Sequence, residues 1–104
     1  MVHVKLFSRE GRVCCFRITG HAGGEAGRDI VCAAVSSAAI MAANTVTEVC
    51  GARAVARMRD GYLLFSVVSD DLARAAEIMD GLRLHLNELQ AQYPHKIQVD
   101  LIEL

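Results

Sequence analysis

Hydrophobic and polar residues alternate along the first residues of the chain, as they do in a half-buried β-strand. Val2, Val4 and Leu6 occupy one set of alternate positions, and a polar turn around Gly11 follows them. Residues 13–19 alternate again and bring the chain back as a second strand. These two segments predict an N-terminal β-hairpin.

Residues 30–47 contain no charged side chain and predict a long helix. Asp29 is placed to cap its N-terminus, and Gly51 is placed to end it. A membrane-spanning helix needs about twenty predominantly apolar residues, whereas alanine, serine, threonine and asparagine make up much of this segment. We therefore expect a helix that packs inside the protein and does not span a membrane. Its predicted packing stripe consists of Val31, Val35, Ala38, Ala42, Val46 and Val49.

The second half of the chain repeats this arrangement. Residues 54–59 and 62–68 flank Asp60-Gly61, a dipeptide that strongly favours a two-residue hairpin turn. Apolar residues then recur at spacings of three and four, which predicts a second helix. Pro94 ends this helix. This apolar stripe consists of Leu72, Ala75, Ala76, Met79, Leu82, Leu86 and Leu89.

Alternation at residues 97–101 predicts one more strand, so the predicted order is β-β-α-β-β-α-β. A two-layer arrangement buries the apolar side of every one of these elements. We therefore predict an α+β fold with a single two-layer domain over residues 1–104. It has a sheet of about five strands, mostly antiparallel, with two helices on one face.

Composition narrows the functional classes. Hydrophobic residues make up 53% of the chain, and the net charge is −1. The eleven lysines and arginines form no run along the sequence, so we expect no direct nucleic-acid binding. No secretory signal pattern opens the chain, and we therefore expect a cytoplasmic protein with reduced cysteines. The spacing of the four cysteines matches no zinc knuckle, so no metal is predicted.

Candidate chemistry lies between the second strand and the first helix. His21 is in a glycine-rich loop, and Cys32 falls in the first turn of the helix, beside unpaired backbone N–H groups. A helix terminus contributes about 0.3–1 kcal/mol, which lowers the pKa of a thiol by less than one unit. A nucleophilic thiol at this place therefore also needs an imidazole, and His21 is the nearest candidate. The alternative is that Cys32 is a buried, inert cysteine, as most single helical cysteines are.

Residues 20–39, GHAGGEAGRDIVCAAVSSAA, closely resemble the signature of the ribosomal-processing cysteine protease family (Prp). The resemblance implies a cytoplasmic endopeptidase, often dimeric, that removes the N-terminal extension of a large-subunit ribosomal protein after an aromatic pair. It implies no cofactor and no metal. The interval from histidine to cysteine is one residue shorter here than is typical of the family.

The resemblance also assigns residues. It places the catalytic cysteine at Cys32 and the catalytic histidine at His21. Gly20, Asp29 and Ser36 match motif positions and are given supporting or substrate-binding roles.

Two other functions stay open from the sequence, and so does the assembly. One is a catalytically silent, ribosome-associated binding module with the same fold. The other is a thiol redox or acyl-transfer protein, which would need a second cysteine close to Cys32 and lacks the CxxC spacing. Leu84 lies opposite the apolar stripe of its helix, and Phe7 lies on the outer face of the sheet. This unpartnered apolar surface predicts a homodimer, as the resemblance also does.

Overall fold

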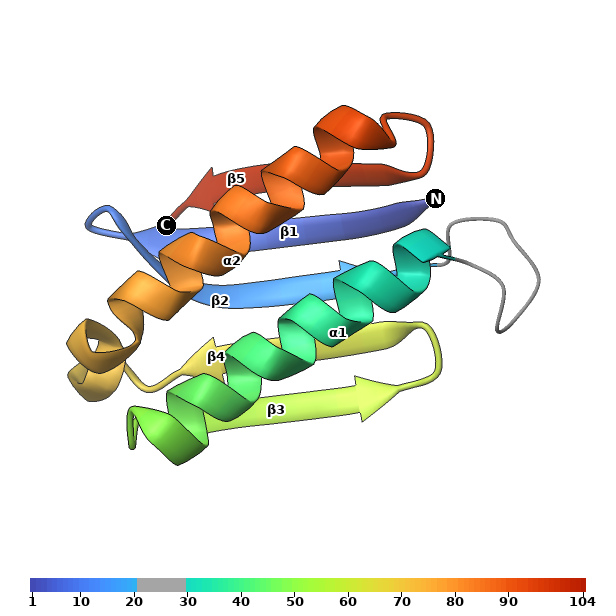
Figure 1. The fold of residues 1–104 in the computed structure, drawn as a ribbon. Helices are drawn as coiled ribbons and strands as arrows, with labels where there is room; N and C mark the ends of the chain where they lie inside the picture. Colours follow the sequence, from blue (N-terminus) through green and yellow to red (C-terminus); the bar gives the residue numbers. More distant parts are fainter. Residues whose placement is uncertain (21–29) are drawn as a thin grey trace.

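The computed structural model describes residues 1–20 and 30–104, which form one α+β domain. The elements follow the predicted order β-β-α-β-β-α-β (Figure 1). Their bounds are β1 (Val2–Arg9), β2 (Arg12–Thr19), α1 (Ile30–Asn44), a π-helical turn (Thr45–Val49), β3 (Ala54–Arg59), β4 (Tyr62–Val67), a 3₁₀ turn (Ser69–Asp71), α2 (Leu72–Gln92) and β5 (Ile97–Glu103).

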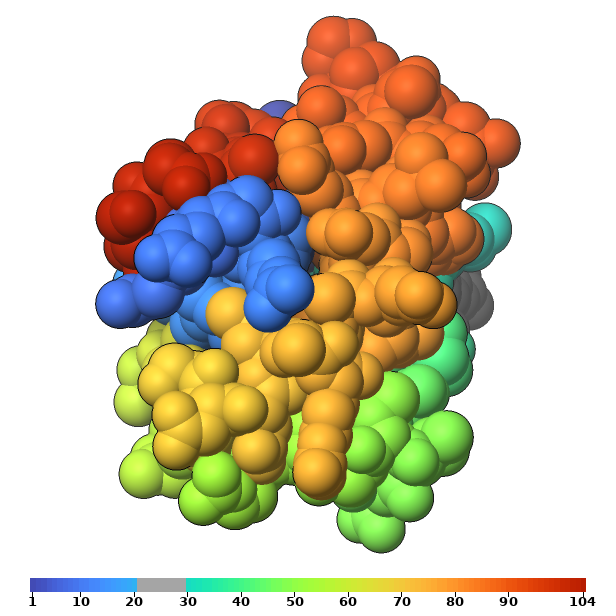
Figure 2. Space-filling model, turned by 90° about the vertical axis from the view of Figure 1, so that its left-hand side faces the viewer, coloured from blue at the N-terminus to red at the C-terminus, as the bar shows by residue number. Residues whose placement is uncertain are grey.

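The five strands form one mixed sheet in the order β3-β4-β2-β1-β5. Every neighbouring pair is antiparallel except β1 and β5, which are parallel. Both helices cover the same face of this sheet (Figure 1). Figure 2 shows the molecule from one end, with α2 on one side and the β1–β2 turn and β5 on the other. The predicted two-layer domain is confirmed.

The core lies between the helices and the inner face of the sheet. Alternate residues of β1 and β2 point into it because successive side chains of a strand face opposite sides. Phe16 and Phe65 come from neighbouring strands, and their rings stack with centroids 5.4 Å apart. From α2, Met79 and Leu86 are fully buried against them. The alternation of β1 and the stripe of α2 were thus read correctly, apart from Ala76, which is half-buried.

The packing stripe of α1 differs from the predicted one at two places, in the middle of the helix and at its end. Val49 is 78% exposed, and Ala39 is fully buried in place of the half-buried Ala38. The helix continues past Asn44 as a π-helical turn, in which Cys50 N–H donates to Thr45 O at 2.8 Å. An i→i+5 turn rotates less per residue than an α-helix, and a stripe placed at 100° per residue therefore misses its last position.

By length and hydropathy alone, Ile30–Val49 could cross a membrane. In the fold it is a helix of the two-layer domain, because its buried residues pack into the core with residues of β1, β2 and α2. The stripe that packs consists of Val31, Val35, Ala39, Ala42 and Val46.

The start of α2 is fixed by an ion pair. Asp71 accepts hydrogen bonds from the backbone N–H of Arg53 at 2.8 Å and from its Nε at 2.9 Å. This guanidinium and the hydrogen bonds hold the pKa of Asp71 at about 2, below its usual range. Asp71 therefore links α2 to the segment before β3, and its side chain does not cap its own helix.

Candidate active site

Three segments meet at one end of the sheet: the end of β2, the first turn of α1, and the β3–β4 turn (Figure 1). Gly20 N–H donates to Gly61 O at 3.1 Å, which joins the end of β2 to the hairpin turn. The Asp60-Gly61 turn is the two-residue hairpin that the sequence predicts, and Gly61 has a φ of +69°. Strand pairing therefore brings segments far apart in the sequence to the start of α1.

Gly20 occupies a position that other residues would not fit. Its φ is +85°, in the left-handed region that favours glycine. A Cβ atom there would lie 2.5 Å from the backbone oxygen of Met1. Gly20 thus lets β2 end close to the neighbouring strand and to the hairpin turn. Its predicted role in the site stays a prediction.

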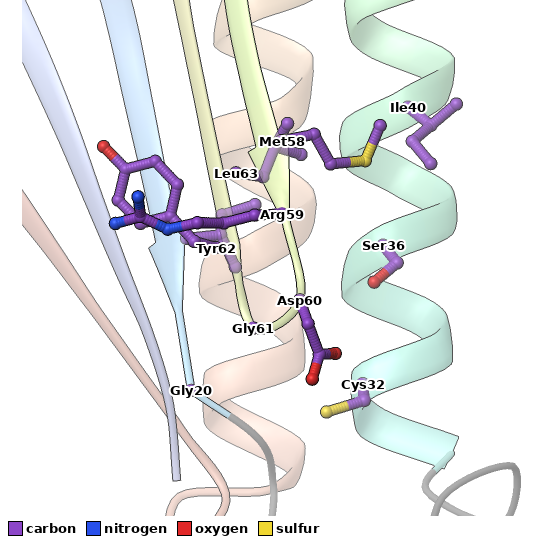
Figure 3. Close-up of a pocket in the computed structure, with 11 residues that line it drawn as sticks. Gly20, Cys32, Ser36, Ile40, Met58, Arg59, Asp60, Gly61, Tyr62 and Leu63 are labelled. Atoms are coloured by element: carbon purple, nitrogen blue, oxygen red, sulfur yellow. The ribbon is translucent and has the colours of Figure 1, made fainter.

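Cys32 is the third residue of α1, in the turn whose backbone N–H groups have no partner within the helix. Its side chain is half-buried and points toward the β3–β4 turn (Figure 3). Ser36 follows one helical turn later, is exposed, and lines the same groove. The structure therefore brings three of the predicted site residues, Gly20, Cys32 and Ser36, to one surface.

The groove beside Cys32 has a volume of about 370 Å³ and runs between α1 and the β3–β4 hairpin. Its polar end holds Cys32, Ser36 and Asp60 (Figure 3). Beyond this end the groove has an apolar wall, formed by Ile18, Ile40, Met58 and Leu63, and Arg59 and Tyr62 also line the groove. Two of these side chains are well exposed, Ile40 at 43% and Met58 at 71%. The groove therefore offers an apolar surface next to a thiol.

Asp60 also lines the groove, although no motif in the sequence marks it as a candidate site residue. The dipeptide Asp60-Gly61 was recognised only as a turn signal. In the structure, its carboxylate and the sulfur of Cys32 point into the same end of the groove (Figure 3). Nothing local in the sequence places this turn beside α1, because the approach depends on the pairing of β4 with β2.

His21 and Asp29 lie outside the described residues, so their predicted roles rest on the sequence alone. The three other histidines, His3, His85 and His95, are exposed, as expected for surface residues. In residues 1–20 and 30–104, no group of three His, Cys, Asp or Glu side chains is arranged to hold a metal ion.

The other cysteines differ from Cys32 in position. Cys14 is buried, and its thiol donates to Phe7 O at 3.4 Å. Burial raises the pKa of Cys15, and neighbouring Cys14 raises it further. Cys50 is half-buried and lies at the carbonyl end of the helical segment whose first turn contains Cys32. None of these three residues lines the groove that contains Cys32.

A comparison with protein-family models matches residues 1–98 to the cysteine protease Prp family. The chain belongs to this family. The match includes β1 to α2 and therefore every predicted site residue. The resemblance recognised in residues 20–39 is confirmed. No curated protein sequence gives a significant match.

Three solved structures show the same fold. The essential ribosomal processing protease Prp from S. aureus, in complex with a covalently linked product peptide, is 25% identical, with a TM-score of 0.89 over 97% of this chain and 99% of that one. The same protease with a substrate peptide gives 24% identity and a TM-score of 0.86, with 97% and 99% covered. SMU.848 from Streptococcus mutans is 24% identical, with a TM-score of 0.87 over 100% of this chain and 99% of that one.

Proposed function

We propose that this Prp family member is a cysteine endopeptidase with Cys32 as nucleophile and His21 as base. The observation that carries the proposal is the position of Cys32, in the first turn of α1 and on the wall of an open groove. A nucleophile needs access to substrate, and a buried structural cysteine has none. The S. aureus Prp of the same fold has been crystallised with peptides.

In this mechanism, His21 accepts the proton of the Cys32 thiol, and the thiolate attacks the scissile carbonyl. Backbone N–H groups at the start of α1 donate hydrogen bonds to the oxyanion that forms. His21 then protonates the leaving amine, and water hydrolyses the thioester. These steps use the side chains and backbone of the chain itself and need no metal or cofactor.

The proposed substrate is the N-terminal extension of a large-subunit ribosomal protein, cut after an aromatic pair. The S. aureus relative is a ribosomal processing protease. The apolar wall of the groove supports an aromatic residue next to the scissile bond, because Ile40, Met58 and Leu63 would bury its ring. In this proposal Ser36 binds substrate and Asp29 supports the start of α1. The protease acts in the cytoplasm.

A cleavage assay tests this function. The purified chain is incubated with a synthetic peptide that spans the extension and the start of the mature ribosomal protein from the same genome. Mass spectrometry should find one cut after the aromatic pair. Cys32→Ser should reduce the rate by at least about 10³-fold, and His21→Ala by about 10²-fold or more. Cys50→Ser is the matched control and should cleave normally.

The outcomes separate the proposal from its alternative. If the native chain binds the peptide and leaves it intact, the protein is the catalytically silent binding module and the proposal is wrong. Cleavage by Cys32→Ser at the native rate would show that another group is the nucleophile.

We also propose that the chain forms a homodimer. Leu84 is 62% exposed on the outer side of α2, as the sequence predicts. Phe7, the other residue on which the prediction depends, is half-buried, with the guanidinium of Arg17 over its ring. A large aliphatic side chain in this position gains free energy when a second subunit covers it.

A further inference from the structure

The face of the sheet opposite the helices carries three rows of side chains that the strand register aligns, and two of these rows hold charged residues. The first row runs through Gln98, His3, Thr19, Tyr62 and Arg59. The second row runs through Asp100, Lys5, Arg17, Leu64 and Arg57. Lysines and arginines that are scattered along the sequence thus come together in the fold. We call these ten residues the open face.

The open face is strongly basic. It holds four of the eleven lysines and arginines of the chain and one of its twelve acidic residues, Asp100. The imidazole of His3 lies in the first row, on the same face. The expectation of no nucleic-acid binding depended on the net charge of −1 and on the absence of a cationic run in the sequence. Strand pairing makes such a run unnecessary, because it places Lys5 directly beside Arg17.

The pairing of Lys5 with Arg17 is unfavourable in the protein alone. Like charges directly opposite each other on neighbouring strands destabilise a sheet. Asp100 is the acidic residue across from Lys5, and its carboxylate also accepts a hydrogen bond from Gln98 at 3.1 Å. A polyanion bound to this face would compensate the two charges.

Planar groups accompany these charges. The guanidinium of Arg59 lies 4.4 Å from the centroid of the Tyr62 ring, on the side of the sheet away from α1 (Figure 3). The guanidinium of Arg17 lies 5.8 Å from the centroid of Phe7. Guanidinium planes and aromatic rings are the surfaces on which unpaired bases stack.

A hollow of about 350 Å³ lies within the open face. It is lined by His3, Lys5, Arg17, Thr19 and Tyr62, which combine cationic groups, a hydroxyl and an aromatic ring. The cations suit a phosphate, and the hydroxyl of Thr19 can hydrogen-bond to a ribose 2′-OH.

We propose that the open face binds single-stranded RNA. An acidic peptide would satisfy the charges and would leave the stacked planar groups without a function. A second copy of the same face would place four cations against four cations. The hollow lies on the side of the sheet away from α1, and the open face adjoins the groove beside Cys32, because Arg59 and Tyr62 also line that groove.

Fluorescence anisotropy with a labelled twelve-residue oligouridylate tests the proposal. Four phosphate contacts to a single strand give a slope of log K against log salt of about −3, which is an affinity loss of about 50-fold between 50 and 200 mM salt. Arg17→Gln should make the slope shallower by about 0.7. Arg83→Gln on α2 removes one positive charge from the other layer and should leave both affinity and slope unchanged.

A second open-face variant and two other oligomers distinguish RNA binding from a general effect of charge. Arg57→Gln, at an exposed position of the edge strand, should weaken binding as Arg17→Gln does while thermal stability and Cys32-dependent cleavage stay at the native level. Equal weakening by Arg83→Gln would overturn the proposal, since net charge alone would then account for binding. Equal or tighter binding of a twelve-residue oligoglutamate or of oligothymidylate would also overturn it.

Discussion

At the residue scale, the site depends on where a few side chains stand relative to one helix. Cys32 lies at the amino end of α1, and Cys50 follows at the carbonyl end of the same helix, after the π-helical turn. The helix dipole favours a negative charge at the first place and opposes it at the second. Two thiols of one helix thus have opposite electrostatic surroundings.

Alkylation by iodoacetamide at pH 7 should therefore modify Cys32 first. Cys14 is buried, and burial raises the pKa of Cys15, so both should react slowly. We expect Cys32 to react at least about 10-fold faster than the other three, as activated thiols do. Peptide mapping by mass spectrometry measures the four rates, and His21→Ala should slow Cys32 alone. Uniform labelling would contradict the dyad.

Asp60 adds a carboxylate at the same end of the groove (Figure 3). This negative charge should repel an anionic reagent from the Cys32 sulfur and leave a neutral one unaffected. Asp60→Asn should therefore raise the rate of modification by iodoacetate relative to iodoacetamide, by about two- to fivefold at low salt. Asp70→Asn removes an equal charge from the turn before α2 and is the matched control. An unchanged ratio in Asp60→Asn would show that the carboxylate does not act on the thiol.

At the element scale, local sequence patterns predict the strands and helices and leave their arrangement open. Alternation in β1 and the three-four spacing in α2 reflect burial on one side, so they are visible in the sequence. The parallel pairing of β5 with β1 and the central place of β2 come from packing between distant segments.

The same division applies to the candidate site. Cys32 and Ser36 are found from one continuous motif, and Gly20 from the same motif. Asp60 and the apolar wall at Met58 come from the second hairpin, and only tertiary pairing places them in the groove. The exposed position of Val49 was missed because nothing in the sequence pattern distinguishes a π-helical turn from an α-helix.

The contact between Arg53 and Asp71 makes a pH-dependent link between elements. The pKa of Asp71 falls to about 2 in the folded protein, from 3.8, because Arg53 donates hydrogen bonds to the carboxylate. The ionised Asp71 therefore stabilises the folded protein fully above about pH 4, and this stabilisation is lost as the pH falls toward 2. Asp71→Asn should lower the melting temperature at pH 7, and the gap to the native chain should close between pH 4 and 2. Asp70→Asn is the control in thermal unfolding by circular dichroism. A gap that is constant with pH would show that the charge of Asp71 does not stabilise the fold.

At the scale of the whole molecule, the two layers present different surfaces. The open face carries the cations of two aligned rows, whereas the outer side of α2 carries both acidic and basic residues around Leu84. Self-association through the open face would bring like charges together and would cost free energy. A homodimer should therefore form through the helical layer, which leaves the open face accessible in each subunit.

Sedimentation velocity distinguishes these arrangements. At tens of micromolar the native chain should sediment as a dimer, since an interface of about 1,200–2,000 Å² is stable there. Leu84→Glu would replace the apolar side chain at the proposed subunit contact with a charge that dimerisation must desolvate, and should shift the chain to a monomer with native circular dichroism. Arg57→Glu introduces the same side chain on the open face and should leave the dimer intact. A monomeric native chain would refute the dimer. Dissociation by Arg57→Glu alone would place the subunit contact on the open face and would leave RNA no access to it.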